Sequence, residues 1–195
     1  MGYNTDYIGR IDVDPPLNGA ERAYLTAFSQ SRRFDRPGGP YAIPGNPAAE
    51  RTEGEGFDVD TSNRIAPGQP SLWCDWAPSW DGCCLAYNGL EKFYNGTRWM
   101  AYLIDHFLAP GAYAKDAGGS WFTGFTFDHH ANGIIAGCRQ DTRELFLLRV
   151  VDNRVVHETL VPGRSPWEEL ALLGYEESNN RDRRARSRRL RGSAS

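Results

Sequence analysis

The chain has 195 residues, of which 40% are hydrophobic and 12% aromatic; this excludes a globally disordered protein and predicts one main folded domain. The formal net charge is −3, but seven arginines and one aspartate give residues 181–191 a charge of +6 and leave −9 elsewhere. That acidic body argues against a generally basic nucleic-acid-binding domain.

The N-terminus lacks the basic and apolar regions of a secretory signal, and no window reaches the roughly 18 apolar residues of a membrane span. The sequence therefore predicts a cytoplasmic protein without a membrane partner, and its four cysteines are expected to be reduced.

A strand and a capped helix are the first predicted elements. Residues 7–13 alternate in hydrophobicity, and Pro15 and Pro16 end the strand. Asn18 followed by Glu21 forms a capping-box pattern, which predicts a helix over 18–33. Proline and glycine then mark residues 35–53 as a loop, with a short strand over 55–59.

Tryptophan is concentrated in the middle of the chain, where four of the six lie between residues 73 and 99. Asp81-Gly82 is a two-residue hairpin signal, because both central positions of such a turn need a positive φ. We expect the flanking residues to form paired strands. Apolar spacing predicts a helix over 97–108, ended by Pro110.

The second half of the chain reads as strands and turns. Residues 121–127 are expected to form a strand, Asn132-Gly133 a second hairpin turn, and residues 145–161 a third hairpin around Asp152-Asn153. A short helix is predicted over 166–173 and a disordered arginine-rich tail over 176–195. The expected fold class is α+β in a single domain, residues 1–175: a mostly antiparallel sheet of six to eight strands, with two main helices on one face.

Cysteine and histidine residues do not predict a metal site or a cofactor. No Cys-x-x-Cys is present, and the adjacent Cys83 and Cys84 would point to opposite faces of a strand. The cysteines are better explained as small buried apolar residues. Residues 128–130, Asp-His-His, resemble the metal motif of DHH phosphoesterases, but the further Asp and His clusters of that motif are missing. They are expected to be polar residues entering a turn.

Carboxylates near the tryptophans leave acid–base chemistry open. Glu53, Glu55, Asp75, Asp81 and Glu91 lie close to the aromatic hairpin in sequence. A carboxylate beside tryptophan can have its pKa raised by desolvation, and two of them beside aromatic rings would suit a sugar or a nucleotide. Acidic residues on the solvent face of an antiparallel strand are the ordinary alternative.

Several segments, taken in order, resemble a group of small uncharacterised proteins from actinobacteria and their phages. The matching pieces are MGYNTD at 1–6, PPL at 15–17, EGEGF at 53–57, QPSLWCDW at 69–76, EKFY at 91–94 and WMAYLI at 99–104. The resemblance covers roughly residues 1–153. It implies a cytosolic setting connected with phages or mobile elements, and it carries over no catalytic residue.

Three functions remain open. The favoured one is a non-catalytic interaction module that binds another protein through Trp73, Asp75, Trp76, Glu91, Lys92 and Tyr94. The second is a small hydrolase of a glycosyl- or nucleotide-type substrate, with Glu55, Asp75 or Glu91 as acid–base groups and Trp73 or Trp76 as a stacking platform. The third is nucleic-acid binding within residues 181–191, through Arg183, Arg184, Arg186, Arg188 and Arg189.

Overall fold

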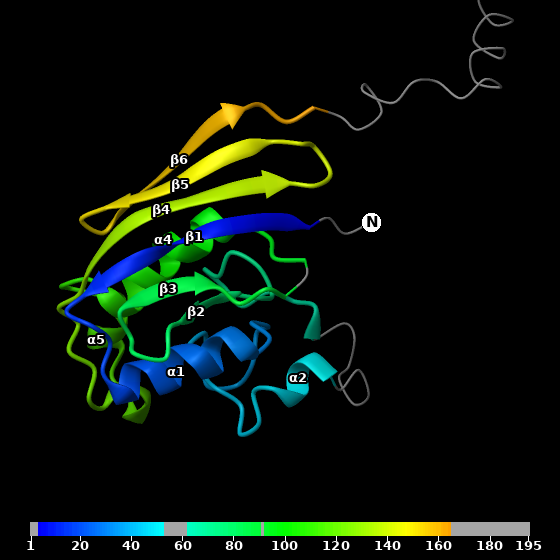
Figure 1. The fold of residues 1–195 in the computed structure, drawn as a ribbon. Coiled ribbons are helices and arrows are strands. Elements are labelled where there is room, and N and C mark those ends of the chain that lie inside the picture. Colours follow the sequence, from blue (N-terminus) through cyan, green and yellow to red (C-terminus); the bar gives the residue numbers. More distant parts are fainter. Residues whose placement is uncertain (1–3, 53–61, 91, 165–195) are drawn as a thin grey trace, which may run out of the picture. The chain divides into compact units, whose positions relative to one another are not determined.

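A six-stranded antiparallel sheet forms the centre of the computed structural model, which describes residues 4–52, 62–90 and 92–164 (Figure 1). The strand order is β2-β3-β1-β4-β5-β6. The strands are β1 (Thr5–Asp14), β2 (Trp76–Pro78), β3 (Cys84–Tyr87), β4 (His130–Arg139), β5 (Leu145–Val151) and β6 (Arg154–Val161). The described residues up to Gly163 form one compact unit, and the groove and the pocket discussed below lie in it.

The helical segments are α1 (Gly19–Gln30), α2 (Ala49–Thr52), α4 (Gly96–Leu103) and α5 (Tyr113–Ala117). A π-helical turn, η1 (Ile104–Leu108), continues α4, and a 3₁₀ turn, η2 (Ser120–Phe122), follows α5. No helix in these described ranges is both long and apolar enough to cross a membrane.

The two faces of the sheet differ in burial. Ile11, Ile135 and Leu148 point to the helical side and are fully buried, whereas Ile8 and Ile134 on the other side are 78% and 45% exposed. The main helices α1 and α4 both lie on the buried side (Figure 1). The predicted α+β class, with an antiparallel sheet and two main helices on one face, is therefore confirmed.

Helix α1 confirms the predicted capping box. The Asn18 side chain accepts from the N–H groups of Ala20 and Glu21, and the Glu21 carboxylate accepts from the Asn18 N–H. The helix ends at Gln30, three residues before the predicted end, because Ser31 has extended backbone angles and its N–H bonds to the Phe28 carbonyl. Local capping signals thus fixed the start of this helix better than its end.

The predicted helix over 97–108 is also present, with one irregularity. Its last turn, η1, is wound as a π-helix, which accommodates one extra residue in the turn. Met100, Leu103, Ile104 and Phe107 are all buried, as the apolar spacing required. This face packs Trp99 and its neighbours against the sheet and α1.

The tryptophan-rich hairpin exists, but its turn is longer than the predicted two residues. Of the two expected turn residues only Gly82 has a positive φ, +78°. Asp81 instead uses its carboxylate to accept from the Ser79 hydroxyl and the Cys83 N–H. This side-chain bonding stabilises a wider loop, because aspartate can replace backbone partners in a turn.

The predicted hairpin turn at Asn132-Gly133 is absent. Asn132 and Gly133 do not turn the chain but lie inside β4, paired with Asp12 and Ile11 of β1. A Cβ on Gly133 would lie 2.6 Å from the Arg10 carbonyl oxygen, so glycine is needed for close strand approach rather than for a turn.

The predicted hairpin turn at Asp152-Asn153 is confirmed, with φ values of +44° and +67°.

Residues 121–127 form no strand either. The backbone of this segment bonds to α1 instead of to a neighbouring strand: Asn18 donates to the Gly124 carbonyl and Glu21 accepts from the Thr126 N–H. Phe122 and Phe127 fill the core from this irregular segment. The expected strand at 55–59, helix at 166–173 and tail at 176–195 lie outside the described residues.

Candidate functional site

Trp76 and Trp99 lie inside the core. Their side chains are 1% and 0% exposed, and both indole N–H groups have partners. Trp76 donates to the Gly96 carbonyl over 2.8 Å, and Trp99 donates to the Ser71 hydroxyl over 2.7 Å. A buried indole whose N–H is satisfied serves packing, so these rings do not line an open ligand cavity.

Asp75 is buried together with the rings. It is fully inaccessible, and the Asn88 side chain donates to its carboxylate over 3.3 Å while the Asn88 N–H donates to its backbone carbonyl. Trp73 is half-buried, with the Arg32 guanidinium 5.5 Å from its ring centroid. Asp75 and Trp76 consequently offer no accessible surface to a partner.

The remaining predicted contact residues are scattered. Lys92 is exposed, and its N–H donates to the Asn4 side chain. Tyr94 is half-buried, and its carbonyl accepts from Ser71. Asp81 is exposed in its loop, where hydrogen bonds from Ser79 and Cys83 lower the pKa of its carboxyl to about 2. Glu53, Glu55, Glu91 and Arg183–Arg189 lie outside the described residues.

An open groove runs between α1 and the loop joining β2 to β3. Its volume is about 530 Å³. Trp80 forms one edge and is 87% exposed, although its backbone carbonyl accepts a hydrogen bond from Arg22. The α1 side is made mainly of small or polar residues: Gly19, Ala23, Thr26, Ala27 and Gln30. Pro47, Pro78 and Ser79 complete the lining.

Sequence reasoning missed Trp80 because it treated the clustered tryptophans as one interior group. A signal was available. Trp80 directly precedes the predicted Asp81-Gly82 turn, and residues at the tip of a hairpin are commonly exposed. Two neighbouring tryptophans, Trp76 and Trp80, therefore have opposite environments.

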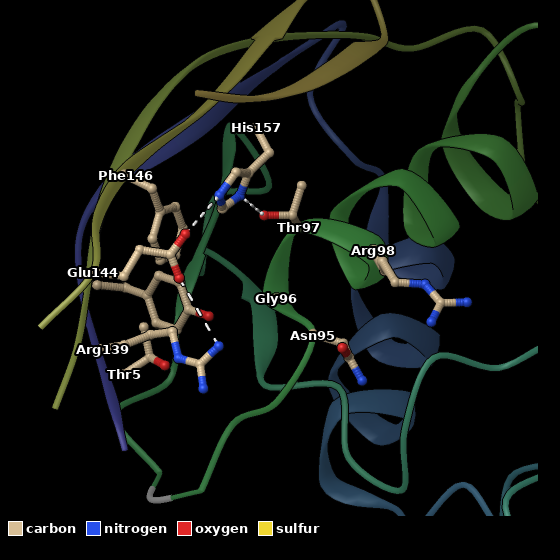
Figure 2. A pocket seen from close by; sticks show the side chains of 10 residues that line it. Thr5, Asn95, Gly96, Thr97, Arg98, Arg139, Glu144, Phe146 and His157 are labelled. Carbon is tan, nitrogen blue, oxygen red and sulfur yellow. Dashed lines mark hydrogen bonds and ion pairs between the residues drawn. The ribbon is translucent and has the colours of Figure 1, made fainter. Parts of the chain in front are cut away.

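A second cavity, smaller and more polar, lies where the first turn of α4 meets the first residues of β1, the end of β4, the start of β5 and the middle of β6 (Figure 2). Its volume is about 180 Å³. A chain of polar contacts crosses it: the Thr97 hydroxyl is 3.1 Å from His157 Nδ1, His157 Nε2 is 3.4 Å from Glu144, and Glu144 is 3.9 Å from the Arg139 guanidinium. We refer to this cavity as the α4 pocket.

Aromatic rings and a glycine shape the floor of the α4 pocket. Phe146 stacks on the His157 ring with 4.5 Å between centroids, and Tyr7 lies beside Phe146. A Cβ on Gly96 would lie 2.4 Å from the Tyr7 hydroxyl oxygen, so only glycine lets the start of α4 come this close. The pocket is thus defined by main-chain packing as well as by its polar side chains.

Glu21 and His129 form a buried polar pair that connects α1 to the segment before β4. Both side chains are 1% exposed, and Glu21 Oε1 lies 3.1 Å from His129 Nε2. Burial raises the pKa of Glu21, but hydrogen bonds from Thr126, Asn18 and His129 outweigh it and leave that pKa below its ordinary value. His129 Nδ1 lies 2.6 Å from the Pro15 carbonyl oxygen.

His129 was expected to enter a turn with its neighbours, and this was wrong. One ring nitrogen, Nδ1, faces the Pro15 carbonyl, and the other, Nε2, faces both the Glu21 carboxylate and the Thr126 hydroxyl, so the ring is held from two sides. Glu21 and His129 contact each other and also bond to Asn18, Thr126 and Pro15, which makes the pair a structural connection. Next to it, His130 is the first residue of β4, and its side chain bonds to Asp152.

His106 lies at the edge of the core on the π-helical turn. Its ring stacks on Tyr102 with 3.8 Å between centroids, and Nδ1 is 2.6 Å from the Tyr41 hydroxyl. Burial lowers the pKa of His106 to about 4. The Nδ1 atom of a neutral imidazole can accept a hydrogen bond from the Tyr41 hydroxyl. This contact connects the loop after α1 to η1.

Comparison with protein-family models, with curated proteins and with solved structures finds no match to this chain. Within the described ranges no three His, Cys, Asp or Glu side chains are grouped so that they could hold a metal ion.

Proposed function

We propose that this protein is a non-catalytic interaction module that binds another protein through the groove between α1 and the β2–β3 loop. The observation that carries the proposal is the exposure of Trp80, 87%, in a chain whose Trp76 and Trp99 are buried. Exposing an indole to water is unfavourable, and tryptophan is among the residues most enriched at the energetic centres of protein interfaces.

The groove beside Trp80 supports a protein partner rather than a small molecule. It is wide and open, about 530 Å³, and Arg22 is its one charged lining residue among those described. Gly19, Ala23 and Ala27 recur every four residues on α1, so they follow one stripe of the helix surface. These small side chains would let the backbone of a partner segment come close while its apolar side chains contact Trp80.

The sequence resemblance adds a setting to this proposal. A module of this kind in a phage or mobile element would act on a protein of an actinobacterial host. The hydrolase alternative needs Asp75 as an acid–base group or Trp76 as a stacking platform to be accessible to a substrate. Asp75 is instead buried with an amide partner, and Trp76 is enclosed in the core.

A pull-down with matched tryptophan variants tests the proposed surface. Trp80→Ala should abolish recovery of a specific partner from an actinobacterial lysate, because it removes the main apolar anchor of the groove. Trp121→Ala is the control: Trp121 is also exposed, 45%, but it does not line the groove. Ala27→Arg should also abolish recovery by filling the groove from the α1 side.

The three variants must first show the same circular dichroism spectrum as the wild type. Equal recovery by wild type, Trp80→Ala and Ala27→Arg would contradict the proposal. Loss of the partner with Trp121→Ala but not with Trp80→Ala would place the interface on a different surface.

A further inference from the structure

The two edges of the sheet differ in how well they are protected from another strand. One edge is β2, which is three residues long, contains Pro78 and contacts α1. The other edge is β6, which is eight residues long, contains neither proline nor lysine, and is exposed at every position except the half-buried Val155 (Figure 1). Shortness, proline and lysine are common means of preventing an edge strand from pairing, and β6 has none of them.

Backbone hydrogen-bonding groups of β6 point away from the sheet at alternate residues. The turn that joins β5 to β6 has a positive φ at both of its residues, which is the type I′ geometry of a two-residue hairpin. In such a hairpin the flanking residues, here Val151 and Arg154, form a hydrogen-bonded pair. The N–H and C=O groups of Val155 and His157 therefore face the open side, where no described strand pairs with them.

The side chains on one face of β6 are ordered so that they complement a copy of themselves. Arg154, Val156 and Glu158 lie on the face away from the helices, because Val155 between them packs against the core. The Arg154 side chain makes no ion pair or hydrogen bond with another described residue. Glu158 accepts from Arg149 only through Oε2, at 3.2 Å. The strand therefore carries a positive and a negative group at equal distances on either side of Val156.

Symmetry and hydrogen bonding leave few ways to pair two copies of β6. In an antiparallel pair, a residue whose backbone groups face the partner lies opposite another such residue, so a two-fold axis must pass through a residue and not between two. An axis at Glu158 would place two carboxylates opposite each other, which is destabilising. An axis at His157 or beyond Glu158 extends the pairing into the irregular register between Thr159 and Val161. An axis at Val156 avoids both problems.

We infer that β6 pairs antiparallel with β6 of a second copy of this chain, with the two-fold axis at Val156. This register uses only the regular part of the strand, residues 154–158. It places Arg154 of each copy opposite Glu158 of the other, which forms two ion pairs, and it brings the two Val156 side chains together at the axis. The open N–H and C=O groups of Val155 and His157 bond to each other across the axis.

The resulting dimer is closed and weak. A two-fold pairing uses the β6 edge of both copies, and the short β2 edge does not extend the sheet further, so association stops at two chains. Paired edge strands of this length bury less than the roughly 1,200 Å² of a standard stable interface, so we expect dissociation in the micromolar range. The groove beside Trp80 lies at the β2 edge and stays open in the dimer.

Sedimentation velocity of the full-length protein, from low micromolar to several hundred micromolar concentration, tests the dimer. The wild type should change from monomer to dimer over this range. Glu158→Arg and Arg154→Glu should each weaken association at least about tenfold, because each places like charges opposite one another twice. The double variant that carries both substitutions should recover wild-type association to within about threefold. Asp116→Arg is the control: it makes the same charge change at an exposed position of α5 and should leave association unchanged.

Cysteine cross-linking tests the register independently of the charge variants. Val156→Cys should form a disulfide-linked dimer on mild oxidation, because directly opposed residues of a non-hydrogen-bonded pair have Cα atoms about 4.5 Å apart. Leu160→Cys is the matched control, since Leu160 is also exposed on β6 but lies far from its symmetry mate in this register. The wild type, with its four native cysteines, gives the background.

Three results would each overturn the inference. The first is a wild type that stays monomeric at every concentration, as it would if another segment or a different protein covered β6. The second is a folded charge-swapped double variant that associates no better than Glu158→Arg. The third is cross-linking of Leu160→Cys that equals or exceeds that of Val156→Cys.

Discussion

Replacing Glu21 with alanine is expected to lower the free energy of unfolding by about 3–5 kcal/mol, because it removes a buried carboxylate and leaves its buried hydrogen-bond donors without an acceptor. The carboxylate accepts from the Asn18 and Thr126 N–H groups and from the Thr126 hydroxyl, and it faces His129. Its removal would leave those donors and a buried imidazole without their acceptor. Urea denaturation followed by circular dichroism measures the effect.

Asp12→Ala is the matched control, since it removes an exposed carboxylate. Asp12 pairs with Arg10 on the surface, where both side chains are more than 60% exposed. This control should change the free energy of unfolding by less than about 1 kcal/mol. Similar losses in the two variants would show that the buried pair is not the connection described.

Glu21 should also give the protein a defined sensitivity to acid. Its pKa is lowered in the folded state from an ordinary value of 4.5, so its contribution to stability is complete above pH 4.5. That contribution is lost as the pH falls through the lower folded-state pKa. Wild type should therefore lose stability more steeply below pH 4.5 than Glu21→Gln does. Parallel curves for the two proteins would contradict this.

The second large effect is expected from Trp99→Ala, which should lower the free energy of unfolding by about 3–5 kcal/mol through the cavity that it creates. Trp99 is fully buried, and its N–H satisfies the Ser71 hydroxyl. The matched variant Trp80→Ala removes the same side chain from an 87% exposed position and should change stability by less than about 0.5 kcal/mol.

Urea denaturation of Trp99→Ala and Trp80→Ala under the same conditions compares their free energies of unfolding. The comparison distinguishes a tryptophan that packs in the core from one that is available to a partner. A large loss with Trp80→Ala would mean that its ring belongs to the core, and the groove would lose its anchor. A small loss with Trp99→Ala would contradict the packing around α4.

Local signals in the sequence predicted much of the fold. Asn18 and Glu21 specified the start of α1 through contacts three residues apart, and Asp152-Asn153 specified a turn through their own backbone angles. The apolar spacing of Met100, Leu103 and Phe107 gave the buried face of α4 and η1. In each case the determining interaction lies within a few residues along the chain.

Long-range contacts decided the elements that sequence reasoning missed. Gly133 looked like a turn residue, but its role is set by the backbone of β1, over a hundred residues earlier. Residues 121–127 had a strand-like composition, but α1 provides their partners. β-strand propensity does not account for hydrogen bonds to residues that are distant in the sequence.

The sites show the same limit. Thr97 and His157 are sixty residues apart, and only the pairing of β5 with β6 brings them together beside α4. Trp80 was separable from Trp76 only by its place at the tip of a hairpin. Trp76 is buried in the core and Trp80 is exposed at the surface. The sequence alone does not give the burial of each residue.

Fluorine NMR of the 5-fluorotryptophan-labelled protein tests the proposed interaction most directly. Signals are assigned with Trp80→Phe and Trp121→Phe variants, and the purified partner from the pull-down is then added. The Trp80 signal should shift on binding, while those of Trp76, Trp99 and Trp121 stay in place. A complex that forms without moving the Trp80 signal would contradict binding through the groove beside α1.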